Sequence, residues 1–167
     1  YDLDRYLLKG DGMNYGINIM LHKQSGNLTG WISYSLGRAL RTFDDPAYPS
    51  VYPASHERIH ELNAICSYEY QKWQFSSTFV CASGTPFTAP ESFYLSSGNL
   101  ITKYGEYNSS RLRPYIRMDL SVNFSFRKDD KQENGLNVSV YNVLARNNEI
   151  MWRLNIDEGT FTYRPMA

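Results

Sequence analysis

Three groups of polar residues in this 167-residue chain could carry chemistry. The first, His56-Glu57-Arg58-Ile59-His60, matches the pattern H-E-x-x-H. On a helix this spacing places two imidazoles one turn apart to bind zinc, with Glu57 as general base. However, Pro53 lies close upstream, and Asn63 and Cys66 stand where the extended zinc motif needs Gly and His. His60 also suits the start of a strand, so zinc hydrolysis is kept only as a minor alternative.

The second group is Arg117 and Asp119, two positions apart on one face of a predicted strand. They could pair with each other or with neighbouring strands and brace a wall, or they could contact a moving plug or a polar substrate. The third group is a set of tyrosines in a long connection, which could stack on sugars, contact a partner, or be ordinary loop aromatics: Tyr94, Tyr104 and Tyr107. We expect no catalysis, no cofactor and no metal, because the sequence offers no phosphate-binding loop and no Ser/His/Asp arrangement.

The clearest elements are strands with one apolar and one polar face. Between residues 115 and 127, apolar side chains alternate with polar ones. The apolar set is Met118, Leu120, Val122, Phe124 and Phe126. Residues 135–143 continue this pattern, and the polar break 128–134 ends at Asn134-Gly135, which predicts a hairpin connection there. Arg117 and Asp119 therefore belong to the polar face of this sheet.

The same alternation predicts four earlier strands, at residues 13–23, 28–42, 60–70 and 73–83, and two weaker ones at 150–156 and 161–164. Residues 1–10 are expected to be a connection. If Gln71-Lys72 forms a hairpin turn, Cys66 and Cys81 lie about four positions out of register, too far apart for a disulfide. Both are therefore predicted to be free thiols.

The connections alternate in length. Those after the first, third and fifth strands are short, whereas those near 44–58 and 84–114 are long and contain prolines. Transmembrane β-barrels have this rhythm, with short periplasmic turns and long extracellular loops. A soluble antiparallel sandwich that binds carbohydrate is the main alternative, since its strands also alternate. The polar faces hold neutral Ser, Asn and Thr more than charged side chains, which favours the barrel.

Composition narrows the classes of partner. Lys plus Arg and Asp plus Glu are 17 each, so the formal net charge is zero and nucleic acid is not an expected partner. No apolar run reaches the roughly 18–20 residues of a membrane helix, but membrane β-strands are only half apolar. Aromatic residues make up 15 % of the chain, and several lie where strands would meet the membrane interface.

Several segments resemble SusC-like TonB-dependent outer-membrane receptors of Bacteroidetes. Arg111-Leu112-Arg113-Pro114-Tyr115-Ile116-Arg117-Met118-Asp119-Leu120-Ser121 is similar to a segment near the carboxyl end of that family, and Ser139-Val140-Tyr141-Asn142-Val143-Leu144-Ala145-Arg146-Asn147 resembles the strand that follows it. Further similarities lie at 23–35, at His60 and at 83–86, so the resemblance covers most of residues 12–148.

The resemblance implies an all-β fold, in which residues 1–167 form the C-terminal portion of an antiparallel transmembrane β-barrel. About seven or eight strands here would belong to a wall of about 22. It implies uptake of an oligosaccharide or oligopeptide nutrient across the outer membrane of a Gram-negative cell. The partners would be the rest of the barrel and its plug, TonB through an N-terminal part, a SusD-like surface lipoprotein and outer-membrane lipid.

The chain also departs from the family pattern. It contains no segment similar to the plug, and it ends at Pro165-Met166-Ala167 instead of the family's terminal aromatic membrane strand. Leu144 stands where an aromatic residue is common, and Asn148 is not the usual neighbour of Asn147. We therefore expect an internal fragment, or one piece of a cleaved or separately encoded barrel.

Overall fold

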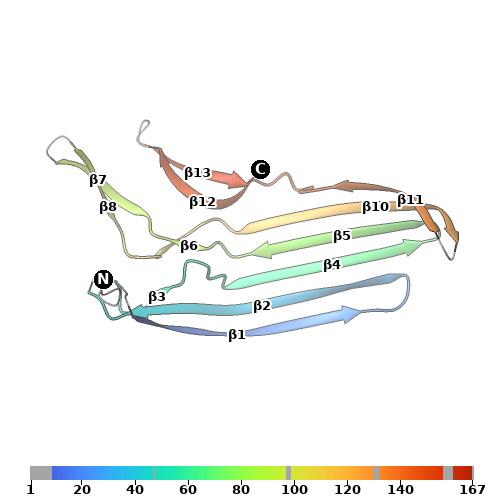
Figure 1. Cartoon of the computed structure of the whole chain (residues 1–167), viewed down its shortest axis with the longest axis horizontal. Coiled ribbons are helices and arrows are strands. Elements are labelled where there is room, and N and C mark those ends of the chain that lie inside the picture. Colours follow the sequence, from blue (N-terminus) through green and yellow to red (C-terminus); the bar gives the residue numbers. More distant parts are fainter. Residues whose placement is uncertain (1–8, 47, 97–98, 130–131, 156–159, 167) are drawn as a thin grey trace, which may run out of the picture.

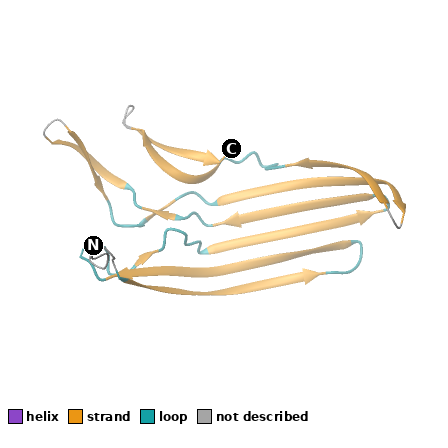
Figure 2. Cartoon of the chain, in the orientation of Figure 1, coloured by secondary structure: helices purple, strands orange, loops and turns teal. Residues whose placement is uncertain are grey.

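The computed structural model describes residues 9–46, 48–96, 99–129, 132–155 and 160–166, and in these ranges the chain is all-β (Figure 2). The six long strands of the main sheet are β1 (Gly10–Lys23), β2 (Leu28–Phe43), β4 (His60–Tyr70), β5 (Trp73–Ala82), β10 (Tyr115–Asp129) and β11 (Gln132–Val140). The other strands are β3 (Tyr52–Pro53), β6 (Pro86–Phe87), β7 (Pro90–Ser96), β8 (Asn99–Tyr104), β9 (Ser110–Arg111), β12 (Asn148–Asn155) and β13 (Thr160–Met166). No helix among the described residues is long and apolar enough to cross a membrane.

The main sheet is antiparallel, in the order β1-β2-β4-β5-β10-β11, with the short β3 paired to β2 (Figure 1). The six predicted long strands are confirmed, with ends that differ from the prediction by at most three positions. The two tight turns, at 24–27 and 71–72, lie at one end of the sheet, and the long connections 44–59 and 83–114 lie at the other (Figure 1). The predicted alternation of short and long connections is therefore present.

Strand register carries the apolar alternation across the whole sheet. One row runs across five strands through Ile19, Tyr34, Leu62, Cys81 and Ile116. Because β1, β2, β4, β5 and β10 pair without a one-residue slip, the apolar positions of their two-residue alternation stay on the same face of the sheet. The cysteines lie on this face four positions out of register and are free, which confirms the prediction.

The opposite face is polar and largely neutral. One of its rows is Thr29, Ser67, Ser76, Ser121 and Ser139. Side chains on this face hydrogen-bond across strands: the Gln74 amide donates to Ser67 Oγ at 3.1 Å, and the Asn137 amide donates to Ser121 Oγ at 2.9 Å. The sheet therefore has one apolar face and one polar face.

The apolar face is uncovered among the described residues. Many of its side chains are exposed, from 36 % for Tyr34 to 72 % for Leu21, and others, such as Leu62 and Met118, are half-buried. The accessible surface of the chain is 12875 Å², whereas a compact protein of this mass exposes about 8,500 Å². Among the residues whose burial is described, the buried apolar side chains lie near the long connections: Tyr52, Ala54, Ala82 and Leu112. The described sheet therefore has no core of its own.

Several strand boundaries differ from the sequence prediction. The predicted hairpin connection at 128–134 is confirmed but is shorter than predicted: β10 ends at Asp129 and β11 begins at Gln132, so Asn134 and Gly135 lie within β11, where Gly135 is opposite Ser125. Pairing continues past them to Asp129 and Gln132, and an irregularity between Ser125 and Arg127 absorbs the offset. Strand pairing thus outweighed the turn tendency of Asn-Gly. Strand β11 also ends at Val140, three residues earlier than predicted, and β1 begins at Gly10, inside the expected connection.

The two C-terminal strands form a separate hairpin instead of extending the main sheet. The segment before it follows the edge of β10, where the Val143 amide donates to the Met118 carbonyl at 2.7 Å. The Asn148 side chain then pairs with the backbone of Ile116, accepting from its amide at 2.9 Å and donating to its carbonyl at 3.0 Å. An amide side chain here takes the place of a neighbouring strand.

Candidate functional site in the long connections

The two long connections meet through an aromatic cluster beside the end of β2. Its four members are Phe43, Tyr48, Tyr52 and Tyr107. The rings of Tyr52 and Tyr107 meet edge to face with centroids 4.8 Å apart, and those of Tyr48 and Tyr107 with centroids 5.5 Å apart. Burial is the largest cause that raises the pKa of Tyr52, and the nearby phenols of Tyr107 and Tyr48 raise it further. The Tyr52 hydroxyl is therefore neutral at physiological pH. The cluster joins the 44–59 connection to residues 105–109.

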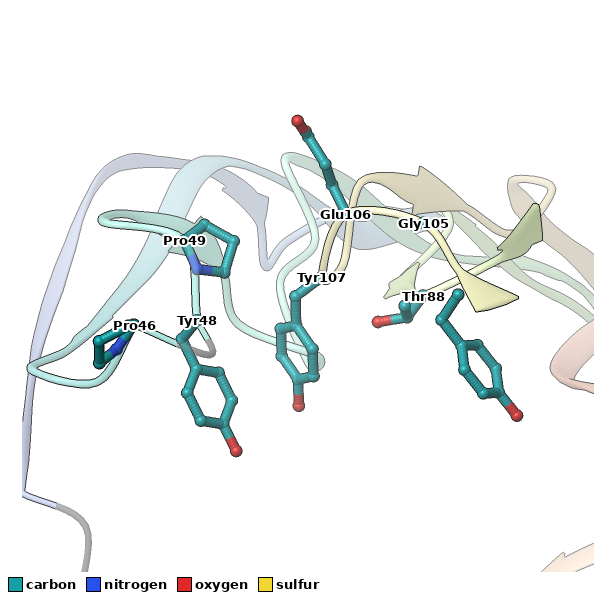
Figure 3. Close-up of a pocket in the computed structure, with 8 residues that line it drawn as sticks. Pro46, Tyr48, Pro49, Thr88, Gly105, Glu106 and Tyr107 are labelled. Atoms are coloured by element: carbon teal, nitrogen blue, oxygen red, sulfur yellow. The ribbon is translucent and has the colours of Figure 1, made fainter. Parts of the chain in front are cut away.

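An open depression of about 730 Å³ lies beside this cluster (Figure 3). Its lining comes from both connections: Pro46, Tyr48, Pro49, Thr88, Tyr104, Gly105, Glu106 and Tyr107. The Tyr48 and Tyr107 side chains point to the same side, whereas Glu106 points away from them (Figure 3). Flat rings with hydroxyls at their tips present both apolar and hydrogen-bonding surface, which suits a polar ligand with apolar faces.

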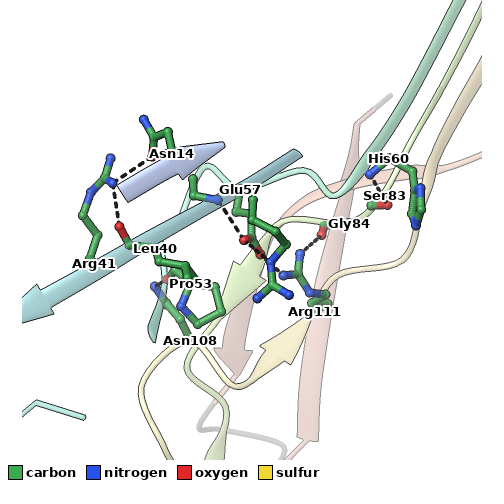
Figure 4. Close-up of polar contacts among 12 residues, drawn as sticks. Asn14, Leu40, Arg41, Pro53, Glu57, His60, Ser83, Gly84, Asn108 and Arg111 are labelled. Atoms are coloured by element: carbon green, nitrogen blue, oxygen red, sulfur yellow. Dashed lines mark hydrogen bonds and ion pairs between the residues drawn. The ribbon is translucent and has the colours of Figure 1, made fainter. Parts of the chain in front are cut away.

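Glu57 links the two long connections to the main sheet through hydrogen bonds and ion pairs (Figure 4). Its carboxylate is 2 % exposed and accepts from Arg38 Nε at 2.8 Å and from the Ala39 amide at 3.0 Å, both in β2. Its second oxygen accepts from Arg111 Nη2 in β9. Arg111 also donates to the Gly84 carbonyl at 3.1 Å. One carboxylate thus joins three stretches of chain.

The surroundings of Glu57 set its charge. Burial by itself raises the pKa of this carboxyl, but the Ala39 amide and the two guanidinium groups stabilise the ionised form more strongly. The net result is a pKa below the ordinary value of 4.5. Glu57 is therefore an anion held between two cations at neutral pH.

Asn108 supplies a second link between the connections. It is buried, and its backbone lies in the left-handed region with φ of 54°. Its side chain donates to the Pro53 carbonyl at 2.8 Å, and its backbone amide donates to Thr88 Oγ1 at 3.0 Å. Asparagine adopts this backbone conformation more readily than most residues. The link holds β3 against the segment that carries Tyr107.

The zinc alternative does not have the geometry it requires. Residues 56–59 form a turn and loop, not a helix, and His60 begins β4. Glu57 is occupied by two arginines, and His60 Nδ1 lies 2.7 Å from the Tyr34 hydroxyl. No group of three or more possible metal ligands occurs in the part of the chain that the structure describes. The motif requires a helix, but here a turn and loop lead directly into β4.

Arg117 and Asp119 lie on the polar face of β10 and pair with each other. Their two nitrogen–oxygen contacts are 2.9 and 2.7 Å long. Asp119 also accepts from the Asn142 amide at 2.8 Å, and the Arg117 guanidinium lies 5.8 Å from the centre of the Tyr141 ring. This arrangement is the internal bracing pair that the sequence analysis considered, and it ties β10 to the segment after β11. Contact with a plug or substrate stays a prediction.

The predicted loop tyrosines are only partly brought together. Tyr104 and Tyr107 line the depression, whereas Tyr94 is exposed on the β7–β8 hairpin and is not among its lining residues. Tyr48 and the Glu57–Arg111 pair were not predicted from the sequence to belong to one site. Arg38 on an otherwise apolar face was the available signal, because such an arginine calls for an anion nearby.

Comparison of the chain with protein-family models, with curated proteins and with solved structures finds no match.

Proposed function

We propose that this chain forms wall and outer loops of a SusC-like TonB-dependent importer in the outer membrane. The observation that carries the proposal is the amphipathic sheet of six long strands, whose apolar face is continuous across the register and is not covered by other described residues. In an outer-membrane barrel this face contacts lipid, and the neutral polar face lines the lumen. Backbone groups of the inner strands β2, β4, β5 and β10 pair with strands on both sides, as the hydrocarbon region requires. The outer edges of β1 and β11 would pair with the remaining strands of the barrel.

The aromatic side chains of the apolar face support the same proposal. Trp73, Phe75 and Phe124 gather beside the 71–72 turn, where the Trp73 and Phe124 ring centroids are 4.5 Å apart. Tyr68 and Tyr70 lie on the same face nearby. Aromatic residues are enriched where membrane strands reach the interface with water. Because the tight turns 24–27 and 71–72 lie at this end of the sheet, it is the periplasmic end in this proposal, and the long connections face outward.

In this role the chain carries no chemical step. The wall surrounds a plug, and TonB-driven movement of that plug admits an oligosaccharide or oligopeptide. The depression between the long connections, with Tyr48, Tyr104 and Tyr107, would contact the substrate or a SusD-like lipoprotein at the cell surface. Arg117 and Asp119 would brace the lumen wall.

Two measurements test the proposal. The native polypeptide that contains residues 1–167 is expected in the outer-membrane fraction, resistant to alkaline extraction, with an intact mass several times the 19.3 kDa of this chain. Cells lacking it should lose uptake of one member of a panel of oligosaccharides and oligopeptides. A folded, soluble polypeptide with a mass near 19.3 kDa would instead support the carbohydrate-binding sandwich.

A further inference from the structure

We propose that Glu57 is a positioning residue that locks the two long connections into one preformed ligand-contact face. The inference rests on the proposed function only in that this face is taken to contact substrate or lid. The locking itself follows from contacts made by the described residues.

The depression depends on both connections. Tyr48 belongs to the 44–59 connection, whereas Tyr104 and Tyr107 belong to the 83–114 connection. A displacement of one connection relative to the other would separate these rings and remove the depression. What fixes the two connections therefore also fixes the face.

Glu57–Arg111 is a buried ion pair that links the two connections. The partners are 54 positions apart in sequence, and the Glu57 side chain is almost fully buried. Glu57 is also anchored to β2 through Arg38 and the Ala39 amide, so Arg111 is tied through Glu57 to the rigid sheet. Breaking this pair would leave the aromatic contacts and the Asn108 bonds as the remaining links.

The charged groups that face Glu57 are Arg38 from β2 and Arg111 from β9. Both guanidinium groups keep their charge across the pH range in which a carboxyl titrates. Acid therefore acts on this cluster by protonating Glu57. Protonation removes both ion pairs at once and should release the 83–114 connection.

Spin labels on the full-length polypeptide can measure this coupling. The labels are placed at Ser50→Cys and Glu106→Cys, one on each connection, with Cys66 and Cys81 replaced by Ala. Ser50 is exposed, and Glu106 points away from the Tyr48 and Tyr107 rings (Figure 3). The distribution of distances between the labels should be narrow. Arg111→Gln, which leaves Glu57 bound to β2, should broaden it about twofold, since local opening then costs less free energy.

Two further variants and a change of pH distinguish a specific effect of Glu57 on the two connections from a general loss of structure. Glu57→Gln should broaden the distribution as Arg111→Gln does. Glu91→Gln, which breaks the exposed pair with Lys103 in the 83–114 connection, should leave it narrow. Acid should broaden the unsubstituted protein and leave Glu57→Gln unchanged. A narrow distribution in Arg111→Gln, while the protein remains folded by circular dichroism, would overturn the inference. This readout does not depend on uptake, so its failure is distinct from failure of the proposed importer.

Discussion

At the scale of single residues, the unusual group is the buried carboxylate of Glu57. Removing an ion from water is costly unless its partners replace the lost hydration. Here Arg38, Arg111 and the Ala39 amide supply three donors. The cluster therefore stabilises the fold only while all its members are present.

Glu57→Gln is expected to lower the free energy of unfolding by roughly 2–4 kcal/mol, because both arginines lose their anion. Urea unfolding of the full-length polypeptide in detergent measures this change. The matched control is Glu91→Gln, for which an exposed pair predicts a loss of about 0.5 kcal/mol or less. Equal losses in the two variants would contradict the account of the cluster.

The same carboxylate predicts how stability depends on pH. Its pKa in the folded state lies below the ordinary value of 4.5, so its contribution is fully present above that value. The contribution is lost as the pH falls through the lower, folded-state pKa. Unfolding measured along a descending pH series should therefore show an acid-dependent loss that Glu57→Gln lacks. If Glu57→Gln loses stability in acid as much as the parent protein does, other carboxyl groups cause the loss.

At the scale of elements, β2 contains two glycines in very different surroundings. A Cβ added at Gly30, where φ is +150°, would lie 2.1 Å from the Ile65 carbonyl oxygen of β4. At Gly37 the nearest atom would be the Tyr15 carbonyl oxygen, at an ordinary 3.6 Å. Gly30→Ala should thus lower the free energy of unfolding by about 1–3 kcal/mol, and Gly37→Ala should change it little. Thermal unfolding of both variants tests this, and similar melting temperatures would refute it.

Asn148 offers a second prediction about an element, the edge of β10. Asn148→Ala removes two hydrogen bonds to Ile116 from a buried site. Unsatisfied buried backbone groups cost about 1–3 kcal/mol each, so the Ile116 amide should exchange with solvent much faster. Asn148→Asp should protect this amide better than Ala, since a carboxylate still accepts from it. Hydrogen exchange by mass spectrometry compares the three proteins, and equal protection in all of them would show that Asn148 is not the link.

The sequence was most informative about these elements where two-residue alternation is strong. The strand from His60 to Tyr70 was predicted with both ends correct, and the apolar faces follow the predicted residues. The hairpin connection at 128–134 was predicted too long, because strand pairing continues past Asn134 and Gly135 to Asp129 and Gln132 despite the local turn signal. Strands β12 and β13 were predicted near 150–156 and 161–164, but alternation does not say which strand each one pairs with, so their separation from the main sheet was not predicted.

The site was less predictable than the sheet because its contacts join distant residues. Glu57 meets Arg38 from 19 positions away and Arg111 from 54. No local pattern encodes either distance. The H-E-x-x-H motif instead suggested zinc, since sequence spacing has the same appearance on a helix and in a loop. Tyr104 and Tyr107 were identified from composition, but their partner Tyr48 depends on how the two connections fold together.

At the scale of the whole molecule, the sheet separates apolar from polar side chains across its thickness. Long strands in continuous register produce this separation, and the apolar side lacks a covering layer among the described residues. Exposed apolar surface of this extent is unfavourable in water. Contact of this face with lipid is therefore the central claim of the proposed function.

Tryptophan fluorescence with brominated lipids tests this claim most directly. Trp73 lies on the apolar face and is 43 % exposed, whereas Trp31 lies on the polar face opposite His22 and Ile65. Two variants of the full-length polypeptide each retain one of these residues, with every other tryptophan changed to Phe. In brominated bilayers, Trp73 should be strongly quenched and Trp31 nearly unaffected. Equal quenching, or stronger quenching of Trp31, would contradict the assignment of the apolar face to lipid.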